Sequence, residues 1–163
     1  MTHRTQQQQF DVWASKHIGI IHKVVRSFCD DPVDRDDLRQ EIHLAMWHAI
    51  PGFTGNAKES TYIYRVALNR AISWVRKHRN ERRHREKFET DPLHFVSEHE
   101  DPRLEVIYAE IRQLPKAERA LILMQLEGFS YEDIAESVGL SVSNVGVRLT
   151  RIRQKLAANL KDK

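Results

Sequence analysis

A group of polar and basic side chains near the C-terminus has the residue types and the spacing that contact DNA. Residues 141–153 hold three arginines, two serines and one asparagine, whose donors and acceptors suit phosphates and base edges. Val145, Leu149 and Ile152 recur at helical spacing and predict a buried stripe, so the positions between them are expected to face outward. The residues expected to bind duplex DNA are Ser141, Ser143, Asn144, Val147, Arg148, Arg151 and Arg153.

Residues 130–155 supply the element that presents this group: a short helix, a glycine turn and a second, basic helix. Ser130 suits the N-cap of the first helix, and Ser141 suits that of the second. Gly139 follows the last apolar residue of the first helix, where a left-handed turn favours a residue without a Cβ. This order predicts a helix-turn-helix that sets its second helix in the DNA major groove. The alternative is an ordinary helical hairpin with a solvated basic face.

A second basic region covers residues 65–87, which hold nine Lys or Arg against two Glu. Aromatic rings stack on exposed bases and cations follow phosphates, so a mixture of the two is typical of a single-strand-binding surface. The alternative is that the aromatic rings belong to a helical core. The aromatic residues are interleaved with polar and basic ones here: Tyr62, Tyr64 and Trp74 with Arg65, Asn69 and Arg70.

The composition and the helical periodicity together predict an all-α fold. Glycine and proline are few and charged residues make up 30 % of the chain. Apolar residues recur at helical spacing over residues 10–29, 34–49 and 61–85, and again from Pro102 onward. We expect one continuous helix over residues 10–29, ended by the acidic stretch around Pro32. Asp34 is the expected N-cap of the next helix.

The same pattern predicts two small helical domains joined by a flexible linker. Residues 1–85 form the first expected domain, and residues 102–163 form the second, which contains the helix-turn-helix. The segment between them, residues 86–101, contains Pro92 and is acidic where the residues before it are basic. It lacks an apolar period, so we interpret it as the linker.

Two motifs, in this order, resemble conserved regions of bacterial RNA polymerase sigma factors. DDLRQEIHLAMWHAI and TYIYRVALNRAISWVRK resemble region 2, and the helix-turn-helix preceded by Leu114, Pro115 and Arg119 resembles region 4. With only these two regions, the chain is similar to the extracytoplasmic-function type. The resemblance departs from the family pattern at Tyr62, where the family usually has Trp. It departs again within the recognition helix, at Ser143, Asn144, Gly146 and Val147.

The resemblance implies a role in transcription initiation, with core RNA polymerase (its beta and beta-prime subunits) and promoter DNA as partners, and an anti-sigma factor as regulator. It implies that the first domain opens the downstream promoter element and the second binds the upstream one. A base flipped from the stack would lie against the loop near Asn56. The residues implied to bind polymerase are Asp37, Leu38, Gln40, Glu41, Leu44 and Trp47. Those implied or expected to bind single-stranded promoter DNA are Phe53, Asn56, Tyr62, Tyr64, Arg65, Asn69, Arg70, Trp74, Arg76 and Lys77.

Other chemistries find no support in the sequence. The aspartates of residues 30–37 precede or open a helix, where acids favour the helix dipole, so we expect no metal site there. No HExxH, CxxC, GxxxxGK or GxSxG motif occurs, so we expect neither catalytic residues nor a cofactor. A single cysteine and the absence of an apolar leader or spanning segment favour a cytoplasmic protein without membrane insertion.

Two further functions remain open from the residues alone. The chain could be a stand-alone helix-turn-helix repressor or activator whose N-terminal domain dimerises or senses a signal. It could also be an adaptor that bridges polymerase to another protein, in which case the arginines of the recognition helix would be dispensable for DNA binding.

Overall fold

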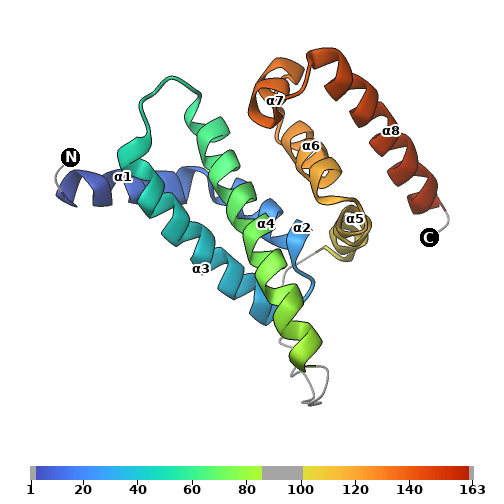
Figure 1. Ribbon diagram of the computed structural model, residues 1–163, viewed down its shortest axis with the longest axis horizontal. Coiled ribbons are helices and arrows are strands. Elements are labelled where there is room, and N and C mark those ends of the chain that lie inside the picture. The colour runs from blue at the N-terminus through green and yellow to red at the C-terminus, as the bar shows by residue number, and fades with distance from the viewer. Residues whose placement is uncertain (1–2, 86–100, 162–163) are drawn as a thin grey trace.

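The computed structural model describes residues 3–85 and 101–161, and these residues form two helical units (Figure 1). The expected linker lies outside the described residues except for Asp101. The N-terminal unit consists of α1 (His3–Lys16), α2 (Ile18–Phe28), α3 (Pro32–Ala49), the 3₁₀ turn η1 (Ile50–Gly52) and α4 (Glu59–Arg85). The C-terminal unit consists of α5 (Pro102–Arg112), α6 (Lys116–Leu126), α7 (Tyr131–Val138) and α8 (Val142–Lys161). The prediction of an all-α fold is confirmed.

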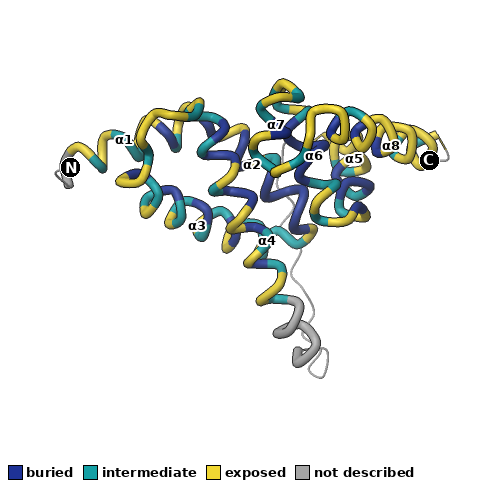
Figure 2. The backbone as a smooth tube through the Cα atoms, turned by 45° about the horizontal axis from the view of Figure 1, so that its top comes forward, coloured by how far each residue is buried: buried dark blue, intermediate teal, exposed yellow. Residues whose placement is uncertain are grey.

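The N-terminal unit is built around the packing of α4 against α2 and α3, while α1 crosses the end of α3 (Figure 1). Each helix turns its apolar side inward, so the buried parts of the chain follow the helical period (Figure 2). Burial of these side chains is the main stabilising contribution to the unit. The fully buried residues include Trp13, Ile21, Val24, Leu38, Ile42, Met46, Ile63 and Ala67.

Two helix boundaries in this unit differ from the prediction. The expected single helix over residues 10–29 is interrupted at His17, so that α1 and α2 are separate. The next helix begins at Pro32 and not at Asp34, because the side chain of Asp31 accepts hydrogen bonds from the backbone N–H groups of Val33 and Asp34. Pro32 therefore occupies the first position of α3, where its missing N–H costs no hydrogen bond.

The C-terminal unit places the helix-turn-helix as predicted. Ser130 Oγ accepts a hydrogen bond from the backbone N–H of Asp133 at 3.1 Å and caps α7. Gly139 ends α7 with φ of 69° and ψ of 36°, a left-handed conformation in which a Cβ would be strained. Ser141 Oγ accepts from the backbone N–H of Asn144 at 3.2 Å at the start of α8. The predicted stripe is confirmed, with Val145, Leu149 and Ile152 buried and Leu156 partly buried.

The two units pack against each other. Helices α5 and α6 contact α2, and helices α6 and α7 contact α4. The ring of Tyr64 in α4 lies 5.4 Å from the ring of Phe129, which precedes α7. The guanidinium of Arg119 in α6 lies over the ring of Phe28 in α2, 4.7 Å from its centroid. Both aromatic and charged side chains therefore hold the units in one arrangement.

None of the helices described for residues 3–85 and 101–161 combines the length and the apolar character that a membrane crossing requires.

Candidate nucleic-acid and protein interfaces

The recognition helix α8 presents a basic face opposite its buried stripe. All seven residues predicted to bind duplex DNA are exposed, including Ser143 and Val147. The Nε atom of Arg148 donates a hydrogen bond to Oδ1 of Asn144 at 2.9 Å, so the two side chains form one polar group on this face. Guanidinium and amide groups in this arrangement suit hydrogen bonds to base edges in a major groove.

Gly146, a departure from the family pattern, lies beside α7. A Cβ at this position would be 3.4 Å from Cε2 of Tyr131, which is an ordinary contact distance. A longer side chain pointing the same way would have to displace the tyrosine ring. Position 146 therefore faces Tyr131 of α7, a relation that the sequence alone does not reveal.

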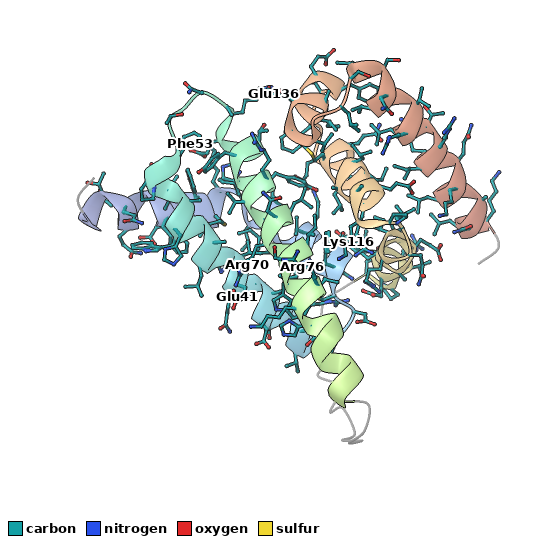
Figure 3. All side chains as sticks on the ribbon, in the orientation of Figure 1. Glu41, Phe53, Arg70, Arg76, Lys116 and Glu136 are labelled. Atoms are coloured by element: carbon teal, nitrogen blue, oxygen red, sulfur yellow. The ribbon has the colours of Figure 1, made fainter. Side chains whose placement is uncertain are left out.

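Helix α4 carries the second predicted DNA surface, and its exposed residues follow one side of the helix. Arg70 forms an ion pair with Glu41 of α3 (Figure 3). Arg76 and Lys77, farther along α4, are exposed, so positive charge continues along this side of the helix. The exposed residues of the predicted single-strand surface on this helix are Arg65, Asn69, Arg70, Arg76 and Lys77.

Two aromatic residues of that prediction are corrected by the structure. Trp74 is buried in the N-terminal unit and stacks on His78, with ring centroids 3.8 Å apart. Tyr64 is fully buried against Phe129, and burial, followed by the charge of Glu127, raises the pKa of its hydroxyl well above the ordinary value. Neither ring is available to stack on a base in this arrangement, because both rings lie on the sides of α4 that pack against the rest of the protein.

The loop between α3 and α4 begins in an aromatic cluster and then reaches solvent. The ring centroid of Phe53 lies 5.4 Å from that of Trp13 and 5.1 Å from that of Tyr62. The hydroxyl of Tyr62 donates a hydrogen bond to the backbone carbonyl of Ala49 at 2.9 Å. Asn56, the predicted base-contacting residue, is exposed. Tyr62 is thus half-buried in the cluster, and its hydroxyl bonds to the protein.

The outer face of α3 forms the rim of an apolar hollow of about 490 Å³. Leu44 contributes to it with 56 % of its surface exposed. Among the residues predicted to bind polymerase, Gln40, Leu44 and Trp47 line this hollow, while Asp37 is exposed nearer the start of α3. Leu38 is fully buried, so its prediction as a surface contact is corrected: its apolar side chain serves the core.

Residues of α1 complete this hollow, and the sequence analysis did not assign them to it. The ring of Phe10 lies edge-on to that of Trp47, with centroids 5.7 Å apart, and Gln6 Nε2 donates to the backbone carbonyl of Trp47 at 2.9 Å. Gln7 and His43 also line the hollow. Burial, followed by the charge of Arg39, lowers the pKa of His43. Helical spacing placed Phe10 on the apolar side of its helix but did not show which residue it contacts. That contact is with Trp47, because α1 and α3 meet in the folded unit.

A second hollow, of about 370 Å³, lies where the two units meet. Arg65 and Asn69 of α4 line one side and Arg148 of α8 lines the other. The structure therefore brings residues from both predicted DNA surfaces to the same hollow. Its apolar lining consists of Leu68, Ile72, Ala117, Ala120, Leu121, Met124, Val138 and Leu140.

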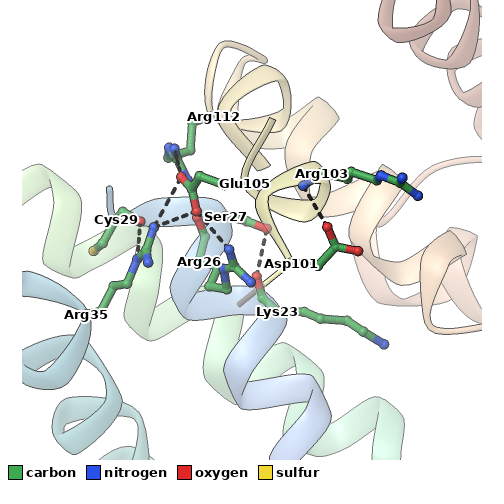
Figure 4. Close-up of polar contacts among 9 residues, drawn as sticks. All are labelled: Lys23, Arg26, Ser27, Cys29, Arg35, Asp101, Arg103, Glu105 and Arg112. Atoms are coloured by element: carbon green, nitrogen blue, oxygen red, sulfur yellow. Dashed lines mark hydrogen bonds and ion pairs between the residues drawn. The ribbon is translucent and has the colours of Figure 1, made fainter. Parts of the chain in front are cut away.

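A carboxylate shared by three arginines fastens the units at the side of α5 (Figure 4). Glu105 lies 2.8 Å from Arg26 and 3.1 Å from Arg35 of the N-terminal unit, and 2.6 Å from Arg112 of its own unit. Burial raises the pKa of Glu105, but the hydrogen bonds from Arg26 and Arg112 and the charges of Arg112 and Arg35 outweigh it and hold the pKa at about 2. Arg112 also donates to the backbone carbonyl of Arg26 at 2.9 Å.

Among the described residues, no group of three or more His, Cys, Asp and Glu side chains has the arrangement that would hold a metal ion.

Family models match most of the chain in two pieces. The model described as "Sigma-70 region 2" matches residues 13–81, and the model described as "Sigma-70, region 4" matches residues 104–156. Both matches fall within the residues that the structure describes. The first covers the α3 side of the hollow, the loop and most of α4, and the second covers the helix-turn-helix.

Curated relatives resemble the chain over most of its length. It is 30 % identical to the RNA polymerase sigma-H factor of Pseudomonas aeruginosa, covering 94 % of this chain and 86 % of the relative. It is 31 % identical to the ECF RNA polymerase sigma-E factor of Haemophilus influenzae, over 76 % of this chain and 72 % of the relative.

Solved structures show the same arrangement of helices. A structure of CnrH in complex with the cytosolic domain of CnrY aligns with a TM-score of 0.69 and 25 % identity, covering 96 % of this chain and 90 % of that one. The sigma factor RpoE of Bartonella quintana, solved with the anti-sigma factor NepR, aligns with a TM-score of 0.67 and 21 % identity over 91 % of this chain and 96 % of that one, a likeness of fold.

Proposed function

The chain belongs to the extracytoplasmic-function type of RNA polymerase sigma factors, and from this membership we propose how its own residues serve promoter recognition and transcription initiation. The observation that carries the proposal is the presence, on one chain, of a capped helix-turn-helix with a basic face and a second unit that exposes an apolar hollow beside a basic helix. The two features lie on different units of the chain, so their combination favours one task that uses both.

The hollow on α3 is the proposed docking surface for core RNA polymerase, through its beta-prime and beta subunits. Leu44 and Trp47 supply apolar area, and Gln40 supplies a polar contact at its rim. Apolar side chains in a rimmed hollow are the usual anchors of a protein interface. Phe10 and Gln7 extend the surface beyond the residues that the family motif indicated.

The exposed side of α4 and the loop before it are proposed to hold the downstream promoter element as a single strand. Arg65, Arg76 and Lys77 offer charges for phosphates, and Asn69 offers a side-chain amide. Asn56, at the exposed part of the loop, is the proposed contact for a base flipped from the stack.

Helix α8 is proposed to bind the major groove of the upstream promoter element. Arg148 and Asn144 form one hydrogen-bonding group at the start of its exposed face, and Arg151 and Arg153 continue the charge along it. Arg151 and Arg153 then contact phosphates and fix the position of α8 along the duplex, while Arg148 and Asn144 contact base edges.

The arrangement in this structure is proposed to be a closed form that opens on promoter binding. Arg65 and Arg148 line one hollow of about 370 Å³, which is the size of a small-molecule site. A DNA duplex, whose major groove alone is about 12 Å wide, is too large for this hollow. For α8 to dock on a duplex while α4 holds a separate single strand, the two units have to move apart.

Polymerase is proposed to supply all catalysis, and the chain itself is proposed to act in the cytoplasm and not as an enzyme. An anti-sigma factor is the proposed regulator. Two observations support it: RpoE of similar fold is solved with its anti-sigma factor NepR, and CnrH is solved with the cytosolic domain of CnrY.

The experiment that tests this proposal is reconstitution with core RNA polymerase. The chain should co-purify with core polymerase, and the mixture should give run-off transcripts that begin at defined positions on genomic fragments. Neither component alone should do so. A chain that binds promoter duplex tightly by itself, and adds no specific initiation to core polymerase, contradicts the proposal and fits a stand-alone repressor or activator.

A further inference from the structure

Helices α1 and α2 meet at His17, and the nearest glycine, Gly19, lies inside α2. His17 interrupts the helix without proline or glycine at that position, and its side chain makes no capping hydrogen bond. Instead, its Nε2 lies 2.7 Å from Oε1 of Glu59, the first residue of α4. Lys16 Nζ donates to the same oxygen at 3.0 Å. The side chains at the break are therefore directed to the end of the loop that joins α3 and α4.

The start of that loop is held at the same junction. Trp13, one helical turn before the break, is fully buried, and its ring contacts those of Phe53 and Tyr62. The hydroxyl of Tyr62 donates a hydrogen bond to the backbone carbonyl of Ala49, where α3 ends. Gly52 lies beside the hydroxyl of Tyr62, since a Cβ at residue 52 would be 3.4 Å from the hydroxyl oxygen.

Between these two attachments the loop is open to solvent. Thr54, Gly55 and Asn56 are exposed, and Gly55 has φ of 79°, which permits the sharp turn at the loop's tip. The loop thus has an exposed tip on a base fixed at both ends. A contact residue discriminates between bases only when its supporting groups hold it within a fraction of an ångström of the productive position.

We propose that Glu59 and Tyr62 are positioning residues that fasten the 53–58 loop to the α1–α2 junction and thereby set how strictly the loop discriminates between bases. This inference rests on the proposed function, because it requires that the loop contact the downstream promoter element. It assigns Tyr62 a role different from stacking on DNA, although the resemblance places it where the family usually has tryptophan. It also gives Lys16 and His17, outside every motif in the sequence, a part in recognition.

The test uses the full chain with core polymerase and a promoter identified by run-off transcription. Each base of the downstream element is replaced by the other three, and initiation is measured for the wild type, Glu59→Gln and Tyr62→Phe. We expect both variants to lose discrimination by about fivefold at the base that the loop contacts, a loss on the order of 1 kcal/mol. Initiation from the best sequence and discrimination at the other positions should change little.

Further variants separate positioning from a general loss of stability. Lys16→Gln removes one partner of Glu59 at an exposed position, and should lower discrimination at the same base. Combining it with Glu59→Gln should add little to the single change, because both remove one interaction. Glu118→Gln in α6 is the control for loss of a glutamate charge and should leave discrimination unchanged. Thermal unfolding of each variant checks the fold.

Two outcomes overturn the inference: unchanged discrimination in folded variants that initiate normally, or an equal loss at every position of the element. Both leave the proposed function standing, because wild-type initiation is measured first. If the wild type gives no specific initiation, the proposed function itself fails, and the inference fails with it.

Discussion

The carboxylate of Glu105 in α5 lies 2.8 Å from the guanidinium of Arg26 in α2, and this contact joins the two units of the chain. Arg26 is only 2 % exposed, and its guanidinium also lies over the ring of Tyr108, 4.6 Å from the centroid. A buried arginine that loses its carboxylate partner is costly. The Glu105 contact therefore opposes separation of the units.

Glu105→Gln should favour separation of the units. The change leaves Arg26 without this carboxylate and weakens the charge contacts to Arg35 and Arg112. Small-angle X-ray scattering of the free chain should show a larger radius of gyration than the wild type. Glu132→Gln, at an exposed position of α7, is the matched control and should leave the radius unchanged. Equal radii for Glu105→Gln and the wild type would show that other contacts hold the closed form.

The low pKa of Glu105 predicts a loss of stability in acid. Its pKa is about 2 in the folded chain against 4.5 as a reference, so the charged form favours folding above pH 4.5, and this contribution is lost as the pH falls toward 2. A shift of this size corresponds to roughly 3 kcal/mol. The carboxylate is 41 % exposed, and solvent screening reduces the expected contribution to about 1 kcal/mol. Urea unfolding at several pH values between 2 and 5 should show this dependence in the wild type and a weaker one in Glu105→Gln.

Leu44→Asp should impair binding to core polymerase. The side chain is 56 % exposed at the hollow on α3, so a carboxylate there costs little stability but opposes an apolar interface. A loss of about 2 kcal/mol in affinity is expected for an anchor of this kind. The matched control is Val33→Asp, on the same helix and 60 % exposed, where an acid favours the helix N-terminus. Equal affinities for the two variants, measured by titration with labelled chain, would remove the hollow from the polymerase interface.

Arg148→Ala should weaken promoter binding by the holoenzyme by about 1–3 kcal/mol and relax sequence preference in the upstream element. The arginine is exposed and bonds to Asn144, so its removal takes away one arm of the proposed base-contacting group. Lys155→Ala, farther along the same helix, should weaken binding evenly across sequences. Footprinting on upstream-element variants compares the two, and an unaltered sequence preference in Arg148→Ala would place this residue on phosphates or away from DNA.

Gly139→Ala should loosen the helix-turn-helix. An alanine at φ of 69° costs about 1–2 kcal/mol, and the strain falls at the turn that sets α8 against α7. The melting temperature should fall, and duplex binding should fall with it. Gly19→Ala is the control, because this glycine is helical and a Cβ there meets no atom within 4 Å. The control should be neutral or slightly stabilising.

Local signals were sufficient to predict the helix-turn-helix. Ser130, Gly139 and Ser141 mark its helix ends by interactions within a few residues, and the stripe through Val145 and Leu149 follows from helical periodicity. The exposed side of α8 could be predicted for the same reason. These features depend on neighbours in sequence and not on where the rest of the chain lies.

Features that depend on distant parts of the chain were missed. The break at His17 is associated with Glu59, 42 residues away, and the burial of Tyr64 depends on Phe129 in the other unit. The resemblance implied that Leu38 contacts polymerase, and the mixture of aromatic and basic residues suggested that Trp74 contacts a single strand. Neither signal shows which side of a helix other helices cover, and both side chains are buried. The Glu105 contact joins residues 79 positions apart and has no local signature.

The central claim is that one chain, bound to core polymerase, binds two promoter elements at once. Changing the spacing between the two elements tests it. Base pairs are inserted or deleted between the elements of an active promoter, and run-off initiation is measured. A change of about five base pairs, half a turn of DNA, moves the upstream element to the opposite side of the duplex. We predict that initiation falls strongly with this change, and that Arg148→Ala has little further effect on the altered promoter. Initiation that is indifferent to the spacing would contradict the account.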